Sequence, residues 1–137
     1  MQTVTPYLLY EDVAAAIEWL GRAFGFEERL RHADAGGTVT HAEIELGGGE
    51  VDLGRPGPDY RSPKRLGAST HLVHVYVEDV DAHCARARQA GAPILQEPID
   101  MPYGDRRYDT EDLEGHRWSF AQRLHDVAPA DWGATEA

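Results

Sequence analysis

Tyr10-Glu11-Asp12-Val13-x-Ala15 recurs as Val77-Glu78-Asp79-Val80-x-Ala82, 67 residues further along the chain. Leu46-x-Gly48 recurs at the same spacing as Leu113-x-Gly115. Matching anchors that keep their order at one spacing indicate a repeated supersecondary unit, because self-similarity at a fixed period marks a repeat architecture. Two such units nearly fill the chain.

Both copies show the same order of predicted elements. In each, an aspartate (Asp12 or Asp79) caps a helix that a glycine (Gly25 or Gly91) ends. Periodicity predicts strands on either side of these helices. The predicted strands are 4–10, 26–32, 38–46 and 50–53 in the first copy, and 72–77, 94–99, 106–110 and 117–122 in the second.

These elements predict an α+β fold of two tandem βαβββ modules. Curved mixed sheets are expected to surround a cavity, with the helices on their outer faces. A segment rich in proline and glycine separates the copies and is typical of a linker. The predicted divisions are a first module at 1–53, a linker at 54–69, a second module at 70–127 and a loosely held tail at 128–137.

Composition limits the class of protein. The 137 residues include 13 Lys and Arg against 24 Asp and Glu, and 42% are hydrophobic, which suffices for a packed core. The negative charge argues against nonspecific nucleic-acid binding. No apolar run is long enough to span a membrane, no secretory leader is evident, and the single Cys84 excludes an internal disulfide. We therefore expect a cytoplasmic protein without nucleic-acid or membrane partners.

Alternation along the strands separates an apolar face from a polar one. The apolar face carries Ala42, Ile44, Val51 and Leu53 in the first copy and Val73, Val75 and Val77 in the second. Each helix is expected to cover this face. The polar face carries His41, Glu43, Glu45, Glu50, Asp52, His74 and Tyr76. So polar a sheet face is either solvated or lines a cavity.

Several local motifs resemble one known family. They are Thr5-Pro6-Tyr7-Leu8-Leu9 with Asp12, His41-Ala42-Glu43, Tyr103-Gly104-Asp105-Arg106, and Asp112-x-x-Gly115-His116-x-Trp118-Ser119. With the tandem units, they resemble the vicinal oxygen chelate superfamily, which includes glyoxalase I, extradiol dioxygenases, and fosfomycin-resistance and bleomycin-binding proteins. The last two motifs are similar to a bacterial glyoxalase/bleomycin-resistance-like branch, from which Leu113 departs by replacing a proline.

The resemblance implies four positions for metal ligands, two in each module. They fall on Thr5, Asp52, Leu72 and Ser119. Only Asp52 is a good ligand, and a catalytic divalent metal normally needs three protein ligands. We therefore expect no cofactor. The alternative is one divalent metal at a rearranged site that uses His41, His74 and Asp52, with Glu43 nearby.

Without a metal, the acidic face favours binding of a cationic or amine-bearing molecule. Tyr7, Tyr76 and Tyr108 are candidates for flat stacking surfaces. The competing interpretation is that the carboxylates are solvated or neutralised by Arg106, Arg107 and Arg117. The predicted ligand-binding residues are Tyr7, His41, Glu43, Asp52, His74, Tyr76, Arg117 and Ser119.

Two functional classes remain open. One is a small-molecule-binding protein, of which the resemblance offers antibiotic sequestration as an example. The other is an enzyme: a metal-dependent lyase, isomerase or dioxygenase, or a metal-free enzyme with His74 or Glu43 as base. The resemblance also implies a homodimer. Cys84, Trp118 and Phe120 are expected in the core, and His116 is expected to orient a turn.

Overall fold

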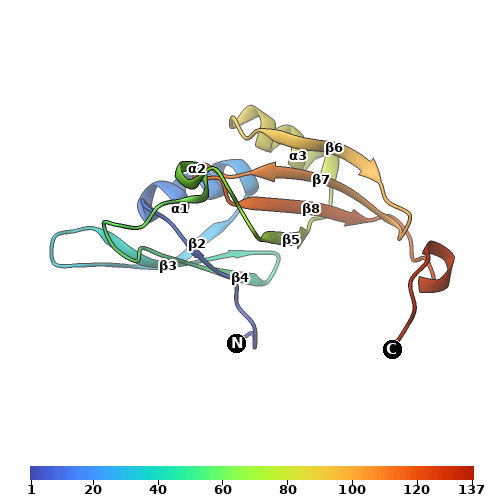
Figure 1. The fold of residues 1–137 in the computed structure, drawn as a ribbon, viewed down its shortest axis with the longest axis horizontal. Helices are drawn as coiled ribbons and strands as arrows, with labels where there is room; N and C mark the ends of the chain where they lie inside the picture. Colours follow the sequence, from blue (N-terminus) through green and yellow to red (C-terminus); the bar gives the residue numbers. More distant parts are fainter.

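The computed structural model describes residues 1–137 and contains eight strands and two long helices (Figure 1). The first half comprises β1 (Tyr7–Leu9), α1 (Val13–Phe24), β2 (Glu27–Ala33), β3 (Val39–Leu46) and β4 (Gly49–Gly54). A short helix, α2 (Pro63–Leu66), follows. The second half comprises β5 (Leu72–Tyr76), α3 (Val80–Gln89), β6 (Ile94–Asp100), β7 (Asp105–Glu111) and β8 (Arg117–Arg123), and a 3₁₀ turn (Pro129–Trp132) ends the chain.

The strands form two mixed sheets of identical topology. The first has the order β1-β4-β3-β2 and the second β5-β8-β7-β6. In both, the outer pair (β1 with β4, β5 with β8) is parallel and the other pairs are antiparallel. The predicted fold of two βαβββ modules is thus confirmed, and neither sheet closes into a barrel.

Helix ends follow the predicted signals. The carboxylates of Asp12 and Asp79 accept hydrogen bonds from the amides of Ala15 and Ala82, which lack partners within their helices. Gly25 ends α1 with a φ of 86°, a left-handed conformation that costs a glycine little.

One hydrophobic core joins the two halves. α1 packs on β3 of the first sheet, α3 packs on the second sheet, and the two helices contact each other. The ring of Phe24, at the end of α1, lies 5.5 Å from Trp118 and 4.7 Å from Phe120 between centroids. Cys84 is buried in the same core. The modules therefore share their core, and the expectations for Cys84, Trp118 and Phe120 are confirmed.

A buried carboxylate ties β8 to the first module. Oδ2 of Asp112 accepts hydrogen bonds from the hydroxyl of Tyr10 (2.6 Å) and the indole N–H of Trp118 (3.1 Å). Oδ1 accepts from the amides of Glu114 and His116. Burial and the adjacent Asp112 raise the pKa of Tyr10 well above its usual value. The Asp-x-x-Gly-His-x-Trp motif thus holds the modules together.

The turn before β8 also caps the first helix. The two carboxylate oxygens of Glu114 accept hydrogen bonds from the amides of Glu11 and Asp12, at 2.7 and 3.0 Å. The carboxylate of Glu11 in turn accepts from the amide of Ser62 and pairs with Arg65 in the linker. These bonds lower the pKa of Glu11 to about 2. Linker, turn and helix α1 therefore form one hydrogen-bonded unit.

Several local expectations were wrong. Gly54 belongs to β4, the predicted linker contains α2, and β1 is shorter than the predicted strand over 4–10. Within the tail, Trp132 packs against Tyr103 with ring centroids 5.5 Å apart. The strand predicted over 94–99 forms β6, and it tolerates Pro98 because one side of an edge strand needs no hydrogen bonds. None of the helices has both the length and the apolar character needed to cross a membrane.

Candidate functional site

Strand register gathers carboxylates on the face of the first sheet that lies opposite α1. Parallel pairing places Tyr7 beside Asp52, and antiparallel pairing places Glu43 opposite Asp52 and Glu45 opposite Glu50. Directly opposed like charges destabilise a sheet. We call this surface the acidic face; it comprises Tyr7, His41, Glu43, Glu45, Glu50 and Asp52.

Only part of this negative charge is neutralised within the chain. Glu45 pairs with Arg29 at 2.8 Å. Glu43 has only His41 as a partner, and neither Glu50 nor Asp52 forms an ion pair. The neighbouring Asp52 carboxylate, followed by burial and the negative charge of Glu43, raises the pKa of Glu50 above its usual value. The acidic face therefore includes three crowded carboxylates, those of Glu43, Glu50 and Asp52, that no Lys or Arg compensates.

A hydrogen-bonded row orders the aromatic side of this face. Nε2 of His41 lies 3.0 Å from the Glu43 carboxylate, and Nδ1 lies 2.8 Å from the hydroxyl of Tyr7. A carboxylate oxygen accepts, so Nε2 of His41 donates to Glu43, and in the tautomer with its proton on Nε2 the ring accepts from Tyr7 through Nδ1. The Tyr7 ring lies over Gly54, where an added Cβ would come 2.5 Å from the ring. Gly54 thus leaves the space that positions Tyr7.

Asp52 is the least satisfied group on the acidic face. Its Oδ1 atom is buried and has no hydrogen-bond partner. Such an atom is costly unless a ligand or ion contacts it. One ligand atom each from His41, Glu43 and Asp52 lies within 4.8 Å of the others. These three side chains therefore lie close enough together to contact one common positive group.

The opposite situation holds on the corresponding face of the second sheet. Nδ1 of His74 lies 3.0 Å from the hydroxyl of Ser119, which is fully buried. Burial, and to a lesser extent Arg107, lowers the pKa of His74. Arg107 pairs with Asp109 and Arg117 with Glu111. Charges on this sheet are therefore compensated internally.

The predicted binding residues thus divide between the two sheets. Tyr7, His41, Glu43 and Asp52 come together on the acidic face. His74, Tyr76, Arg117 and Ser119 lie on β5 and β8 of the second sheet. A cavity of about 320 Å³ is lined by Glu50 from the first sheet and by His74 and Tyr76 from the second, but by none of the four residues gathered on the acidic face.

Other site expectations need correction. Tyr108 cannot stack on a ligand, because it is fully buried with its hydroxyl 2.6 Å from Nδ1 of His83. Arg106 pairs with Asp81 and Asp100 and does not neutralise the acidic face. Sequence reasoning missed His71, which bonds to His116 across 45 positions. No periodic pattern could have paired residues so far apart in the sequence.

Comparison with known proteins agrees with this architecture. The family model of the Glyoxalase/Bleomycin resistance protein/Dioxygenase superfamily matches residues 3–120. The chain belongs to this superfamily. Among its relatives, an uncharacterized protein of Mycobacterium bovis is 33% identical over 129 residues, which cover 90% of this chain and 85% of the relative.

Solved structures of the superfamily share the fold. TioX from Micromonospora sp. ML1 is 41% identical, with a TM-score of 0.74 over 90% of this chain and 100% of that chain. A glyoxalase/bleomycin resistance protein/dioxygenase from Nocardioides is 20% identical, with a TM-score of 0.66 over 94% of this chain and 88% of that chain. The second likeness concerns the fold alone.

The four metal positions implied for the superfamily do not fit a metal in this chain. Leu72 has no ligand atom, and Ser119 is buried against His74. Asp52 alone offers a strong ligand there. The donor set that does suit a divalent ion lies further across the first sheet, on His41, Glu43 and Asp52.

Proposed function

We propose that the protein binds a small cationic or amine-bearing molecule on the acidic face, without a metal and without chemical conversion. The observation that carries this proposal is the uncompensated group of Glu43, Glu50 and Asp52, in which Oδ1 of Asp52 is buried without a partner. A positive ligand would supply the missing counter-charge and the missing hydrogen bond.

Tyr7 supports the aromatic part of this proposal. Its side chain is about half exposed, and the row through His41 and Glu43 fixes its hydroxyl. A ring held in this way offers a face to a cation or to a flat organic ring. Basic antibiotics combine a positive charge with flat rings. We therefore include sequestration of such an antibiotic in the proposed function.

The proposal includes a homodimer in the cytoplasm. Leu72, Tyr76 and Ile99 are large apolar side chains that remain exposed on the second sheet. A second copy that covers them would also enclose the polar faces and withdraw a bound ligand from water. Light scattering after size exclusion would give twice the monomer mass if this part is correct.

Benzamidine and benzamide test the cation preference, because they share shape while only benzamidine is positively charged. We expect benzamidine to bind about tenfold more tightly than benzamide, since a charge-assisted hydrogen bond contributes ~1.5–3 kcal/mol. Glu43→Gln should remove most of this preference for benzamidine. Affinities are measured by calorimetry at low and high salt, and the benzamidine affinity should fall as salt rises.

Glu111→Gln is the matched control for this experiment. It removes the same formal charge, but from the second sheet, where Glu111 pairs with Arg117. The proposal expects Glu111→Gln to leave both affinities unchanged. Equal binding of the two probes, or equal losses in the two variants, would count against recognition by the acidic face.

A divalent metal is the second candidate, favoured by the convergence of His41, Glu43 and Asp52. Nε2 of His41 and the two carboxylates would hold the ion, once the hydrogen bond between His41 and Glu43 is broken. When bound, such an ion supplies Lewis-acid chemistry, which would make the protein an enzyme. In this candidate Glu43 stands where His74 was expected, because the ligand atoms that lie close together are those of His41, Glu43 and Asp52.

Metal content separates the two candidates. Protein without a histidine tag is dialysed against trace Mn, Fe, Ni and Zn and analysed by elemental mass spectrometry. The leading proposal expects well under one equivalent of metal, both in the wild type and in His41→Phe. One equivalent that disappears in His41→Phe would replace the leading proposal by the metal-dependent one.

A further inference from the structure

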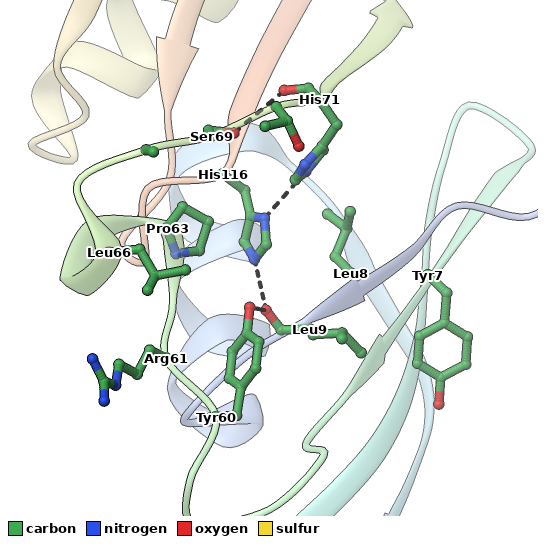
Figure 2. A pocket seen from close by; sticks show the side chains of 12 residues that line it. Tyr7, Leu8, Leu9, Tyr60, Arg61, Pro63, Leu66, Ser69, His71 and His116 are labelled. Atoms are coloured by element: carbon green, nitrogen blue, oxygen red, sulfur yellow. Dashed lines mark hydrogen bonds between the residues drawn. The ribbon is translucent and has the colours of Figure 1, made fainter.

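A second pocket lies between β1, the linker and the turn before β8 (Figure 2). Its volume is about 470 Å³, within the range of small-molecule sites. Leu9 lies on one side and Pro63 and Leu66 on the other, with the rings of His71 and His116 between them (Figure 2). The pocket is thus mainly apolar, with a pair of imidazoles set into its wall.

A chain of hydrogen bonds fixes the protons on this pair. Nε2 of His116 lies 2.7 Å from the carbonyl oxygen of Leu9, which can only accept, so His116 carries its proton on Nε2. In an imidazole that carries one proton the other nitrogen accepts, and the partner of Nδ1 of His116 is Nε2 of His71 at 3.2 Å. His71 therefore donates through Nε2, which leaves its Nδ1 without a proton.

Nδ1 of His71 is the open end of this chain. It has no hydrogen-bond partner within the protein, and the His71 side chain is exposed whereas His116 is buried. Burial of part of the ring, and then the facing His116, lowers the pKa of His71, while Asp112 acts in the opposite direction. The lowered pKa favours the neutral ring, and the hydrogen bond between His71 and His116 orients its Nδ1 acceptor.

Little charge faces this acceptor. Arg61 lines the pocket but extends away from His116 (Figure 2), and it forms no ion pair. The hydroxyl of Tyr60 is already committed, because it donates to the Leu9 carbonyl at 2.9 Å. A mainly apolar wall with a free imidazole acceptor, beside the hydroxyls of Ser69 and Thr70, matches a ligand that has an apolar body and one donor.

We propose that this pocket is a second binding site, for a small neutral molecule with an apolar ring and one hydroxyl or N–H group that donates to Nδ1 of His71. The proposal does not depend on the acidic face, since its ligand is uncharged and its acceptor lies outside that face. Only Tyr7 borders both sites.

Phenol and anisole form the test pair, because methylation removes the donor and keeps the ring. Binding is followed by amide chemical shifts in ¹H–¹⁵N NMR spectra. We expect phenol to bind about tenfold more tightly than anisole, because anisole cannot donate a hydrogen bond to Nδ1 of His71. Phenol should also shift the amide resonances around His71.

His71→Phe keeps a ring in place and removes the acceptor. It should remove the preference for phenol, whereas Leu66→Ala should weaken phenol and anisole equally by removing apolar wall. Both side chains are exposed, so both variants are expected to fold. The proposal would be overturned if phenol and anisole bound the wild type with equal affinity. It would also be overturned if neither bound at concentrations of about 10 mM.

The tautomer of His71 provides an independent readout. In protein with ¹⁵N-labelled histidine rings, free wild type should show Nδ1 of His71 unprotonated and Nε2 protonated, and phenol should shift the Nδ1 resonance. A proton found on Nδ1 in the free protein at pH 7.5 would overturn the proposal, because the acceptor would then not exist.

Discussion

Asp112→Ala is expected to lower the free energy of unfolding by about 4 kcal/mol, a large part of the ~5–15 kcal/mol typical of a single domain. The substitution leaves four donors without their acceptor: the Tyr10 hydroxyl, the Trp118 indole N–H and two backbone amides. Buried donors that lose a partner keep their full desolvation cost. Urea unfolding followed by far-ultraviolet circular dichroism measures the loss.

Two further variants show whether the effect comes from the buried bonds. Asp112→Asn keeps the shape and one acceptor oxygen, so we expect about half the loss. Asp109→Ala removes a partly exposed carboxylate whose partner is the partly exposed Arg107. It should lower the free energy of unfolding by at most about 1 kcal/mol. If Asp112→Ala were as mild as Asp109→Ala, the hydrogen-bonded tie between the modules would not contribute to stability as described.

Gly104→Ala is expected to destabilise the protein by about 3 kcal/mol or more, because strain and a steric clash add to lost hydrogen bonds. Gly104 has a φ of 99°, and an added Cβ would lie 2.1 Å from the carbonyl oxygen of His125. Relief of that clash must move the segment whose amides, at Leu124 and His125, donate to the Gly104 carbonyl. Thermal and urea unfolding both report the change.

Gly37→Ala is the matched control for the conformational part. Gly37 has a φ of 86° and nothing within 4 Å of an added Cβ, so only left-handed strain is introduced. This strain should cost about 1 kcal/mol. A similar cost in both variants would mean that the close approach of residue 125 to Gly104 is not rigid.

The sequence was sufficient for most of the fold because local signals and the repeat agreed. Both aspartate caps, the glycine that ends α1 and the alternating strands each had a local physical cause that tertiary packing did not override. α2 was missed because a four-residue helix carries no period. The burial of Tyr108 could not be predicted from the sequence either, since it depends on α3 lying across β7.

The candidate site was only partly predictable. Alternation correctly placed Glu43 and Asp52 on one face, because register and alternation are local properties of paired strands. The pairing of His74 with Ser119, and of His71 with His116, depends on which strand edges the linker brings together. That information is tertiary, so the composition of each sheet face could be predicted but the neighbours of each histidine could not.

The double use of the Leu9 carbonyl has a consequence for association between molecules. β1 is an edge strand, and an unpaired edge invites strands from other chains. Here the outward carbonyl of Leu9 already accepts from Tyr60 of the linker and from His116 of the turn before β8, so the linker contributes part of the cover over this edge. Shortening the linker would expose the edge of β1 to pairing with strands of other molecules. Aggregation would then begin under conditions in which the core is still folded.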